Sequence, residues 1–406
     1  MIVSKSFQRS EPRVCLVLAA LLLGGTNSAA ADSSMLDTLQ MHGFLSQALV
    51  ITDRNDFFGP SSSGSGSGSL KYTEIGANAS IRPHQDVLIA AQVLSRRAGG
   101  DGSDAKPELD YGVVDYQMVS NQQRTLGAQL GRFKNPFGFY NQTRDVAFTR
   151  PSILLPQSIY FDRTRSLGLA GDGISIYLEE RLPKGILRTQ VGAGKAQVGD
   201  DVERTLGLEA LPGSLDSQSS AIGQIRYEHD GGRFIAALST ASAEAKYSSP
   251  IESLDDGRFK FRPWIVSLQY NAENWSLTGE YAVRKLSLDN FDAFRNFETT
   301  GESWYLQYSR RINDEWQWFT RYDSLSNNRS DRSGKKFEAQ TGRPAHSQYA
   351  DDITLGVQWT PMSRLMLAAE YHHIDGTGWL PTQDNPDPAD TSRRWNMLLF
   401  QLSLRF

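Results

Sequence analysis

The pattern that decides the fold is contained in ten residues: Trp275-Ser276-Leu277-Thr278-Gly279-Glu280-Tyr281-Ala282-Val283-Arg284. The odd-numbered residues of this stretch are aromatic, aliphatic or glycine, whereas most of the even-numbered residues are polar or charged. Alternation with a period of two is typical of a β-strand whose two faces meet different environments. The same alternation recurs at 353–359 and 365–372, so we expect an all-β protein.

Two kinds of β-protein show such alternation: a soluble sandwich and a transmembrane antiparallel barrel. The strands indicated here approach the 9–11 residues that cross a bilayer at a tilt, and are longer than the five or six usual in soluble proteins. Aromatic rings also recur on the face predicted to point outward, and such rings prefer the lipid headgroup zone. These predicted outward aromatics are Trp264, Tyr270, Trp275, Tyr281, Trp304, Tyr308, Trp316, Trp359 and Trp395. We therefore expect the barrel.

The lengths of the connections between strands alternate as well. Short turns are expected at 83–86, 120–123, 182–185, 229–232, 271–274, 313–314 and 360–363. Longer polar stretches are expected near 53–69, 98–107, 133–166, 199–218, 246–258, 287–299, 326–349 and 376–393. Seven short turns and eight long loops require sixteen strands. Short turns on one side, long extracellular loops on the other and an even strand number are the outer-membrane pattern.

The N-terminal segment predicts export. Lys5, Arg9 and Arg13 precede a short apolar run, and Ala29-Ala30-Ala31 resembles a cleavage site, so we interpret residues 1–31 as a signal peptide. Residues 32–406 then form one barrel domain. The only cysteine, Cys15, lies in the signal, so the exported part has no disulfide or thiol chemistry. The mean hydropathy of −0.43 suits a barrel, in which only every second residue is apolar.

The C-terminal stretch Phe400-Gln401-Leu402-Ser403-Leu404-Arg405-Phe406 alternates and ends on an aromatic residue. It resembles the terminal strand of outer-membrane barrels, which the barrel-assembly machinery reads. That resemblance implies a contact between Phe406 and this machinery. It also implies lipid and lipopolysaccharide as surroundings.

The most informative segment of the sequence lies in the third long loop. It reads Gly131-Arg132-Phe133-Lys134-Asn135-Pro136-Phe137-Gly138 and continues through Arg144-Asp145 to Arg150-Pro151. Further on come Arg163, Arg165 and the glycine-rich 166–173. Over residues 126–180 the sequence resembles the phosphate-selective porin O and P group. The resemblance implies that this loop folds into the lumen and forms its constriction.

The third loop carries a cationic surplus in a chain of net charge −4. Its cations are Lys134, Arg144, Arg150, Arg163 and Arg165. In one interpretation they form an anion-binding constriction, because cations in a narrow lumen attract anions. In the other, they bind loop carbonyls and wall carboxylates and merely hold the loop in place. The lysine-rich ladder of a phosphate funnel is missing, so the phosphate preference of the family is not carried over.

Further charges fall in the inward phase of the strands. We expect a mixed-sign, water-facing lumen lining from Arg226, Glu280, Arg284, Arg321, Asp323 and Glu370, with Arg405 near the end. No cofactor or metal site is expected, because His372 and His373 point to opposite faces of one strand. No basic stripe indicates nucleic acid.

These features favour a passive diffusion channel for small polar solutes, with an anion preference of the phosphate or carboxylate type and a homotrimeric assembly by analogy. Two alternatives remain open: an outer-membrane barrel enzyme, and a substrate-specific export or uptake channel. No nucleophile motif accompanies His346 or His372, so we expect no enzyme. We also expect that neutralising Arg144, Arg150, Arg163 and Arg165 together shifts selectivity toward cations without harming folding.

Overall fold

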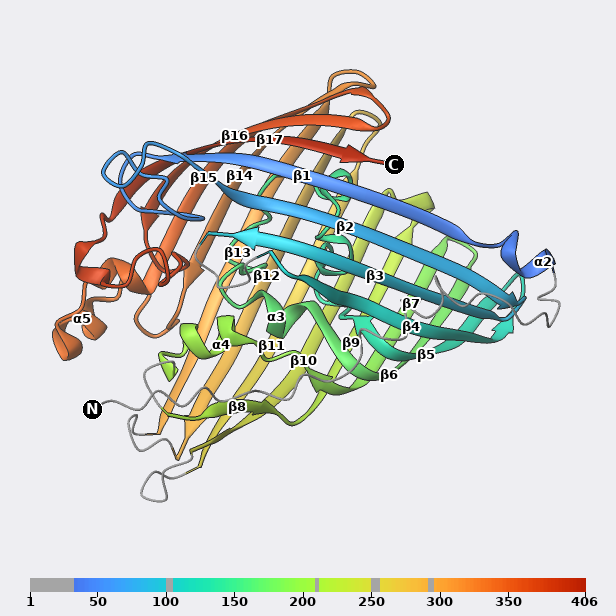
Figure 1. The fold of residues 1–406 in the computed structure, drawn as a ribbon, viewed down its shortest axis with the longest axis horizontal. Coiled ribbons are helices and arrows are strands. Elements are labelled where there is room, and N and C mark those ends of the chain that lie inside the picture. Colours follow the sequence, from blue (N-terminus) through green and yellow to red (C-terminus); the bar gives the residue numbers. More distant parts are fainter. Residues whose placement is uncertain (1–32, 100–104, 209–211, 250–255, 291–295) are drawn as a thin grey trace, which may run out of the picture.

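The protein forms one closed, antiparallel β-sheet, seen from the side in Figure 1. This computed structural model describes residues 33–99, 105–208, 212–249, 256–290 and 296–406. The predicted signal peptide, 1–31, lies outside the described residues. Each strand pairs with its neighbours along the chain, and the first strand, β1 (Gln40–Thr52), also pairs with the last, β17 (Arg394–Arg405). That pairing closes the barrel and leaves no open edge, as a sheet in lipid requires.

The remaining strands follow in chain order. They are β2 (Ser69–His84), β3 (Val87–Ala98), β4 (Pro107–Ser120), β5 (Arg124–Lys134), β6 (Ala170–Leu182), β7 (Gly185–Ala196), β8 (Ser214–Ser217), β9 (Ser219–His229), β10 (Phe234–Ser248), β11 (Gly257–Asn271), β12 (Trp275–Asp289), β13 (Phe297–Arg311), β14 (Trp316–Ser326), β15 (Tyr349–Met362) and β16 (Leu365–Gly376). β8 and β9 both pair with β10 and are separated only by Gln218, so they occupy one position. The barrel thus has the sixteen strand positions predicted from the connection lengths.

The connections alternate between the two ends of the barrel as predicted. The long ones are named here L1 to L8, and those used below are L1 (53–68), L3 (135–169), L4 (197–213), L7 (327–348) and L8 (377–393). Several predicted loops are shorter than expected, because the sheet continues into them: 246–248 and 287–289 still belong to strands. The paired strands extend well past the alternating apolar stretch by which the sequence located them.

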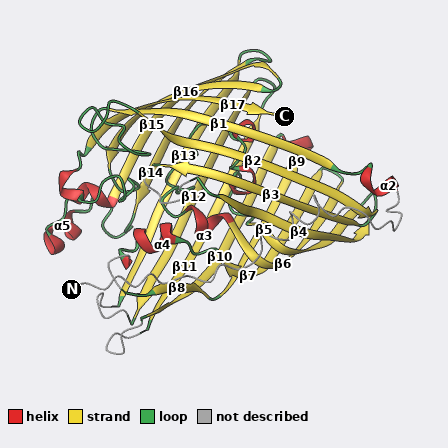
Figure 2. Cartoon of the chain, in the orientation of Figure 1, coloured by secondary structure: helices red, strands yellow, loops and turns green. Residues whose placement is uncertain are grey.

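Helices are few and short. They are α2 (Ser33–Leu36), η1 (Asn141–Thr143), η2 (Ala147–Thr149), α3 (Arg165–Leu169), α4 (Asp200–Thr205), η4 (Asp230–Gly232), α5 (Lys335–Thr341), η5 (Ala345–Gln348) and η6 (Pro388–Asp390). In the part of the chain that is described, none is long and apolar enough to span a membrane. Figure 2 shows α3 and α4 among the strands, with α2 and α5 at opposite ends of the molecule.

The outer surface of the barrel is apolar. Alternate residues of each strand expose large hydrophobic side chains, including Leu130, Val191 and Leu355, and the outward aromatics Trp264 and Trp304. An uncovered belt of this kind is stable only against lipid. The fold is therefore that of a transmembrane barrel of the outer-membrane type, with a third loop folded inward.

One aromatic residue was assigned to the wrong face. Trp395 is buried, its ring centroid lies 5.5 Å from that of Trp379, and its Nε1 donates to the carbonyl of Gly376. The outward residues of β17 are even-numbered, such as Leu398 and Phe400. Trp395 is odd-numbered, so the period of two itself places it inside.

Folded loops fill the lumen at the end of the barrel where the long loops lie. One buried cluster joins L1, L3 and L8 through Phe57, Ile153 and Trp379. A second places L4 against β10 to β12 through Val202 and Phe259. The hydrophobic core of this barrel consequently lies inside it, between the loops and the wall, and it fixes L3 in the lumen.

Candidate functional site: the third loop and its cavity

L3 leaves β5 and is tied at its base by two asparagines. The backbone N–H of Asn135 donates to the carbonyl of Leu169 at 3.0 Å, and its side-chain amide donates to that of Gly168. The side-chain amide of Asn141 donates to the carbonyls of Asn135 and Gly168. The two ends of the loop are thereby held together, and the intervening residues project into the lumen.

A glycine turns the loop against the far wall. Gly138 has φ of +62°, and a Cβ on it would lie 2.3 Å from the Tyr160 hydroxyl. Its N–H donates to Ser239 Oγ, and the next N–H, of Phe139, donates to a carboxylate oxygen of Glu280 at 3.0 Å. Any side chain at this position would be strained by φ and blocked by Tyr160.

Carboxylates of the wall bind the loop backbone. Glu370 accepts from the N–H groups of Ile153 and Leu154, and Asp323 accepts from that of Ser158 at 3.4 Å. Buried backbone N–H groups need such acceptors because no water reaches them. These carboxylates, predicted to line a water-filled lumen, are instead almost completely buried beneath L3.

Glu280 holds the loop through side chains as well. It accepts from the hydroxyls of Tyr160 at 2.6 Å, Tyr305 at 2.9 Å and Ser267 at 2.5 Å. Together with the bond from Phe139, this carboxylate has four donors, two from the loop and one each from β11 and β13. Glu280 is therefore a main attachment point of L3 to the wall.

Two of the predicted lumen cations take part in the same contacts. Arg321 is buried and donates to Ser152 Oγ of L3, Gln307 and Thr354. Arg226 is only partly covered, pairs with Glu228 at 3.0 Å and lies over the Phe139 ring. Both side chains point inward as predicted, but each meets the loop rather than open water.

Four of the five predicted loop cations have carboxylate partners. Lys134 pairs with Asp110 at 2.6 Å and with Asp145, which also contacts Arg165. Arg150 pairs with Glu74 at 2.9 Å, and Arg144 lies 3.6 Å from Asp162. We call this group, with Arg96, the paired cluster.

The charges of the paired cluster are largely compensated inside the protein, because its five cations lie among four carboxylates. Burial lowers the pKa of Arg165 to about 9, helped by the nearby positive charges of Arg144 and Arg96. Burial also lowers the pKa of Arg144. At Arg150 burial acts in the same direction, but Glu74, Tyr72 and Asp162 together outweigh it and raise the pKa. These cations serve mainly to neutralise buried carboxylates and to satisfy loop carbonyls.

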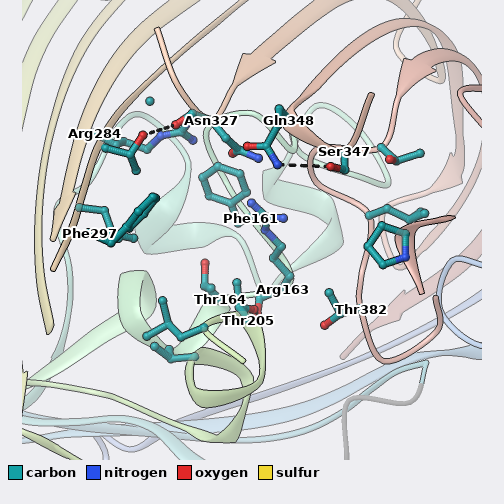
Figure 3. Close-up of a pocket in the computed structure, with 18 of the residues that line it drawn as sticks. Phe161, Arg163, Thr164, Thr205, Arg284, Phe297, Asn327, Ser347, Gln348 and Thr382 are labelled. Carbon is teal, nitrogen blue, oxygen red and sulfur yellow. Dashed lines mark hydrogen bonds between the residues drawn. The ribbon is translucent and has the colours of Figure 1, made fainter. Parts of the chain in front are cut away.

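Arg163 differs from the other four. Among the described residues, its guanidinium has no carboxylate within ion-pair distance and no hydrogen-bond partner, and burial alone lowers its pKa to about 10. It lies 5.4 Å from the ring centroid of Phe161, and Arg284 of β12 lies 4.6 Å from the same centroid. In Figure 3, Phe161 is drawn between the two arginines.

These two arginines border a cavity of about 410 Å³ between L3, L4, L7, L8 and the wall of β11 to β13. Arg343 of L7 is a third cation of the lining. The described lining includes no aspartate and no glutamate. Arg284 keeps its place because Nη1 donates to the carbonyl of Ser158 and because Gly301 leaves room beside Nη2.

An arrangement resembling a hydrolytic triad lies elsewhere in the wall. His372 Nδ1 is 2.7 Å from Asp352 and 3.2 Å from Thr354 Oγ1. Thr354 is fully buried and is also approached by Arg321, so a substrate has no access to its hydroxyl. In the described residues there is no group of three side chains placed to hold a metal ion.

Sequence reasoning missed Glu74, Arg96 and Phe161. Glu74 lies in the inward phase of β2, which is a signal that was present. Arg96 carries no comparable signal, because Arg97 beside it is equally charged and points outward. The role of Phe161 depends on the approach of Arg284 from a distant strand.

Comparisons with known proteins agree on the fold. No protein-family model matches the chain, and no curated protein sequence matches it. Among solved structures, an anion-selective porin from Comamonas acidovorans is similar at 13% identity and a TM-score of 0.55, covering 91% of this chain and 99% of that one. The outer membrane channel DcaP of Acinetobacter baumannii is similar at 12% identity and a TM-score of 0.54, with coverage of 91% and 97%.

A third similar structure is OmpT, an outer membrane protein of Vibrio cholerae, in its in-vitro folded trimer form. Its identity is 9% and its TM-score 0.52, with coverage of 91% of this chain and 99% of that one. At such identities the likeness establishes the porin-like barrel fold. It leaves the solute to be argued from the lumen.

Proposed function

We propose that the protein is a passive diffusion channel of the outer membrane that prefers anions. The observation that carries this proposal is the cavity beside L3, which is lined by Arg163, Arg284 and Arg343 and, in its described lining, by no acidic side chain. A solute that passes L3 on this side meets uncompensated positive charge. The chain as a whole is acidic, so this charge is local.

The physical basis is electrostatic focusing. Charges of one sign inside a narrow lumen with low-dielectric walls produce a potential that concentrates counter-ions. The paired cluster contributes little to that potential, because each of its cations has a nearby carboxylate. Among the described residues, Arg163 and Arg284 have no carboxylate within ion-pair distance, although the charge of Asp323 reaches Arg284, and they therefore set the sign of the potential.

Conductance of the purified protein in planar bilayers tests the proposal. In a potassium chloride gradient, we expect a reversal potential that shows chloride to be more permeant than potassium. Replacing Arg163 with glutamine should reduce this preference. Absence of conductance, or a wild-type preference for potassium, would contradict the proposal.

The direction of insertion follows from the same pattern. We propose that the long loops face outward, toward lipopolysaccharide, and that the short turns face the periplasm. Phe406 is largely exposed beyond β17, and its backbone N–H and carbonyl exchange hydrogen bonds with Gly43 of β1. An aromatic terminus at the closing strand supports the proposed contact with the barrel-assembly machinery. Protease accessibility of L7 on intact cells would test the orientation.

The distribution of outward aromatics supports the proposed homotrimer. In the described residues, strands β11 to β16 expose rings such as Trp264, Tyr281, Trp304 and Trp316, whereas Tyr116 is the one large exposed ring of β1 to β7. Interfacial aromatics mark lipid-facing surface. The half of the barrel formed by β1 to β7, which exposes fewer aromatic rings, therefore suits contact with neighbouring subunits. A tryptophan at Ala91 of β3 should weaken the trimer in native electrophoresis, whereas one at Ala369 of β16 should not.

Membership of the phosphate-selective O and P group is likewise proposed, on the resemblance of residues 126–180. The phosphate preference of that group is not part of the proposal. The cavity beside L3 has no lysine in its described lining, and much of that lining is apolar.

A further inference from the structure

The cavity beside L3 has two chemically different sides. Arg163 and Arg284 form one side, with Phe161 between them. The opposite side is formed by apolar residues of L4 and the wall, among them Leu206 and Leu288. A solute that fits both sides must itself have a charged end and an apolar body.

We propose that this cavity binds amphipathic organic anions, with the carboxylate on the guanidinium of Arg163 and an aromatic or short aliphatic body against the edge of Phe161 and the apolar side. The proposal rests on the proposed anion-preferring channel and names its substrate class. It concerns a binding site within the lumen that a solute occupies while it passes.

The arginine pair lacks an anion. Arg163 has no hydrogen-bond partner among the described residues, and the one described side-chain hydrogen bond of Arg284 goes to a neutral carbonyl, that of Ser158. Two guanidinium groups close to one ring repel each other, and a carboxylate bound to Arg163 reduces that repulsion. Guanidinium groups bind carboxylates through paired N–H donors, which gives such a contact both strength and direction.

The apolar side selects against small, strongly hydrated anions. Phe259 and Leu288 are buried wall residues, and Phe297 and Leu286 extend the same surface to the cavity. Inorganic phosphate gains nothing from this surface and loses hydration beside it. An aromatic ring gains free energy there by leaving water, and it can contact the edge of Phe161.

The size of the cavity agrees with such a solute. Its volume of about 410 Å³ falls within the range of roughly 300–1,000 Å³ typical of small-molecule sites. A benzoate-sized anion fills only part of this space, so it keeps some water and stays loosely held. Loose binding is what a conducting channel requires, because a solute must leave as easily as it enters.

The test is equilibrium binding of benzoate to the detergent-solubilised full chain, measured by saturation-transfer NMR. This measurement does not depend on conductance. Benzamide serves as the neutral counterpart, and inorganic phosphate is the competing anion without an apolar body. We expect benzoate to bind, benzamide to bind at least about tenfold more weakly, and equimolar phosphate not to displace benzoate.

Substitutions test whether benzoate binds in the cavity beside L3. Arg163→Gln should weaken benzoate binding by at least about tenfold. The matched control is Arg332→Gln, which removes an exposed L7 arginine that pairs with Glu302 outside the cavity and should change nothing. Phe161→Leu should weaken benzoate binding while acetate still permeates, which separates the ring from the charge. Heat-modifiable electrophoretic mobility shows whether each variant is folded.

The outcomes separate the two proposals. Benzoate binding that is equal in wild type and folded Arg163→Gln would overturn this inference, and so would displacement by equimolar phosphate. If the wild type conducts anions preferentially in either case, the proposed function stands. If benzoate binds through Arg163 but the protein conducts nothing, the site stands and the proposed channel function falls.

Discussion

The two flanks of L3 both carry arginines, but the arginines have different roles. On the flank toward β2 to β5, Arg150 and Arg165 pair with Glu74 and Asp145. On the flank toward β11 to β13, Arg163 has no such partner in the described residues and faces a cavity. A buried cation with a carboxylate partner holds structure, whereas a cation exposed to a cavity without one acts on solutes. Charge counts along the chain cannot separate these cases, because a count ignores which charges are neutralised.

Removing Glu74 should have the largest effect, because it leaves Arg150 buried without its carboxylate and takes one of two carboxylates from Arg96. Breaking a buried ion pair by removing one partner costs about 3–5 kcal/mol. We expect Glu74→Ala to release the paired flank of L3 and to increase single-channel conductance, with new trypsin cleavage in the loop. Glu302→Ala, which removes the partner of the exposed Arg332, should leave both measurements unchanged. Wild-type conductance and protease resistance in Glu74→Ala would show that the paired cluster does not hold the loop.

Neutralising Arg144, Arg150, Arg163 and Arg165 together should have the second-largest effect. The structure changes the expectation drawn from sequence, because three of these four arginines lie in the paired cluster. We now expect the quadruple glutamine variant to lose heat resistance and to show variable conductance, as L3 becomes mobile. Thermal unfolding followed by circular dichroism would check this. If the quadruple variant were fully stable and only its selectivity changed, the paired cluster would act on permeation rather than hold the loop.

Arg163→Gln alone should change selectivity without changing structure. Because no described residue depends on its guanidinium for a hydrogen bond, folding and conductance should stay near wild type while the reversal potential moves toward cations. Arg165→Gln is the matched variant from the other flank. It should cost stability by leaving Asp145 less compensated and alter selectivity less. Equal shifts in reversal potential for the two variants would remove the distinction between the flanks.

Gly301→Ala should have the smallest effect. A Cβ at this position would lie 3.1 Å from Nη2 of Arg284, so the guanidinium must move by a few tenths of an ångström. We expect a slight decrease in anion preference with normal folding, measured by the reversal potential. Gly342→Ala is a control for the substitution itself at a site with open space, although its φ of +71° adds some strain. A large loss of anion preference in Gly301→Ala would mean that the position of Arg284 is more critical than its contacts indicate.

Much of the fold could be read from local pattern. Alternation along 275–284 and 353–359 identified strands, and the alternating connection lengths gave the strand number. Both signals are local, because the period of two depends only on the direction of successive side chains. Trp395 shows that the side of each residue must be taken from the alternation within its own strand. In β17 the odd-numbered residues point inward, so Trp395 lies inside the barrel.

The site was predictable only as a segment. The sequence identified L3, its cations and the inward charges Glu280, Arg284 and Glu370, but not their partners. Glu74 and Arg150 are 76 residues apart, and Ile153 and Glu370 are 217 apart. Contacts over such separations depend on how the barrel closes, for which no local pattern exists.

The sequence by itself thus determined a transmembrane barrel of sixteen strand positions with a cationic third loop, because strand alternation and loop composition are properties of short segments. Only the tertiary structure decided which of those cations are neutralised. Closure of the barrel brings Glu74 and Asp110 to one flank of the loop, beside its own Asp162, whereas the described lining around Arg163 on the other flank has no acidic side chain. The electrostatic potential at a point depends on all charges near it in space, so the property proposed to govern permeation arises when the chain folds.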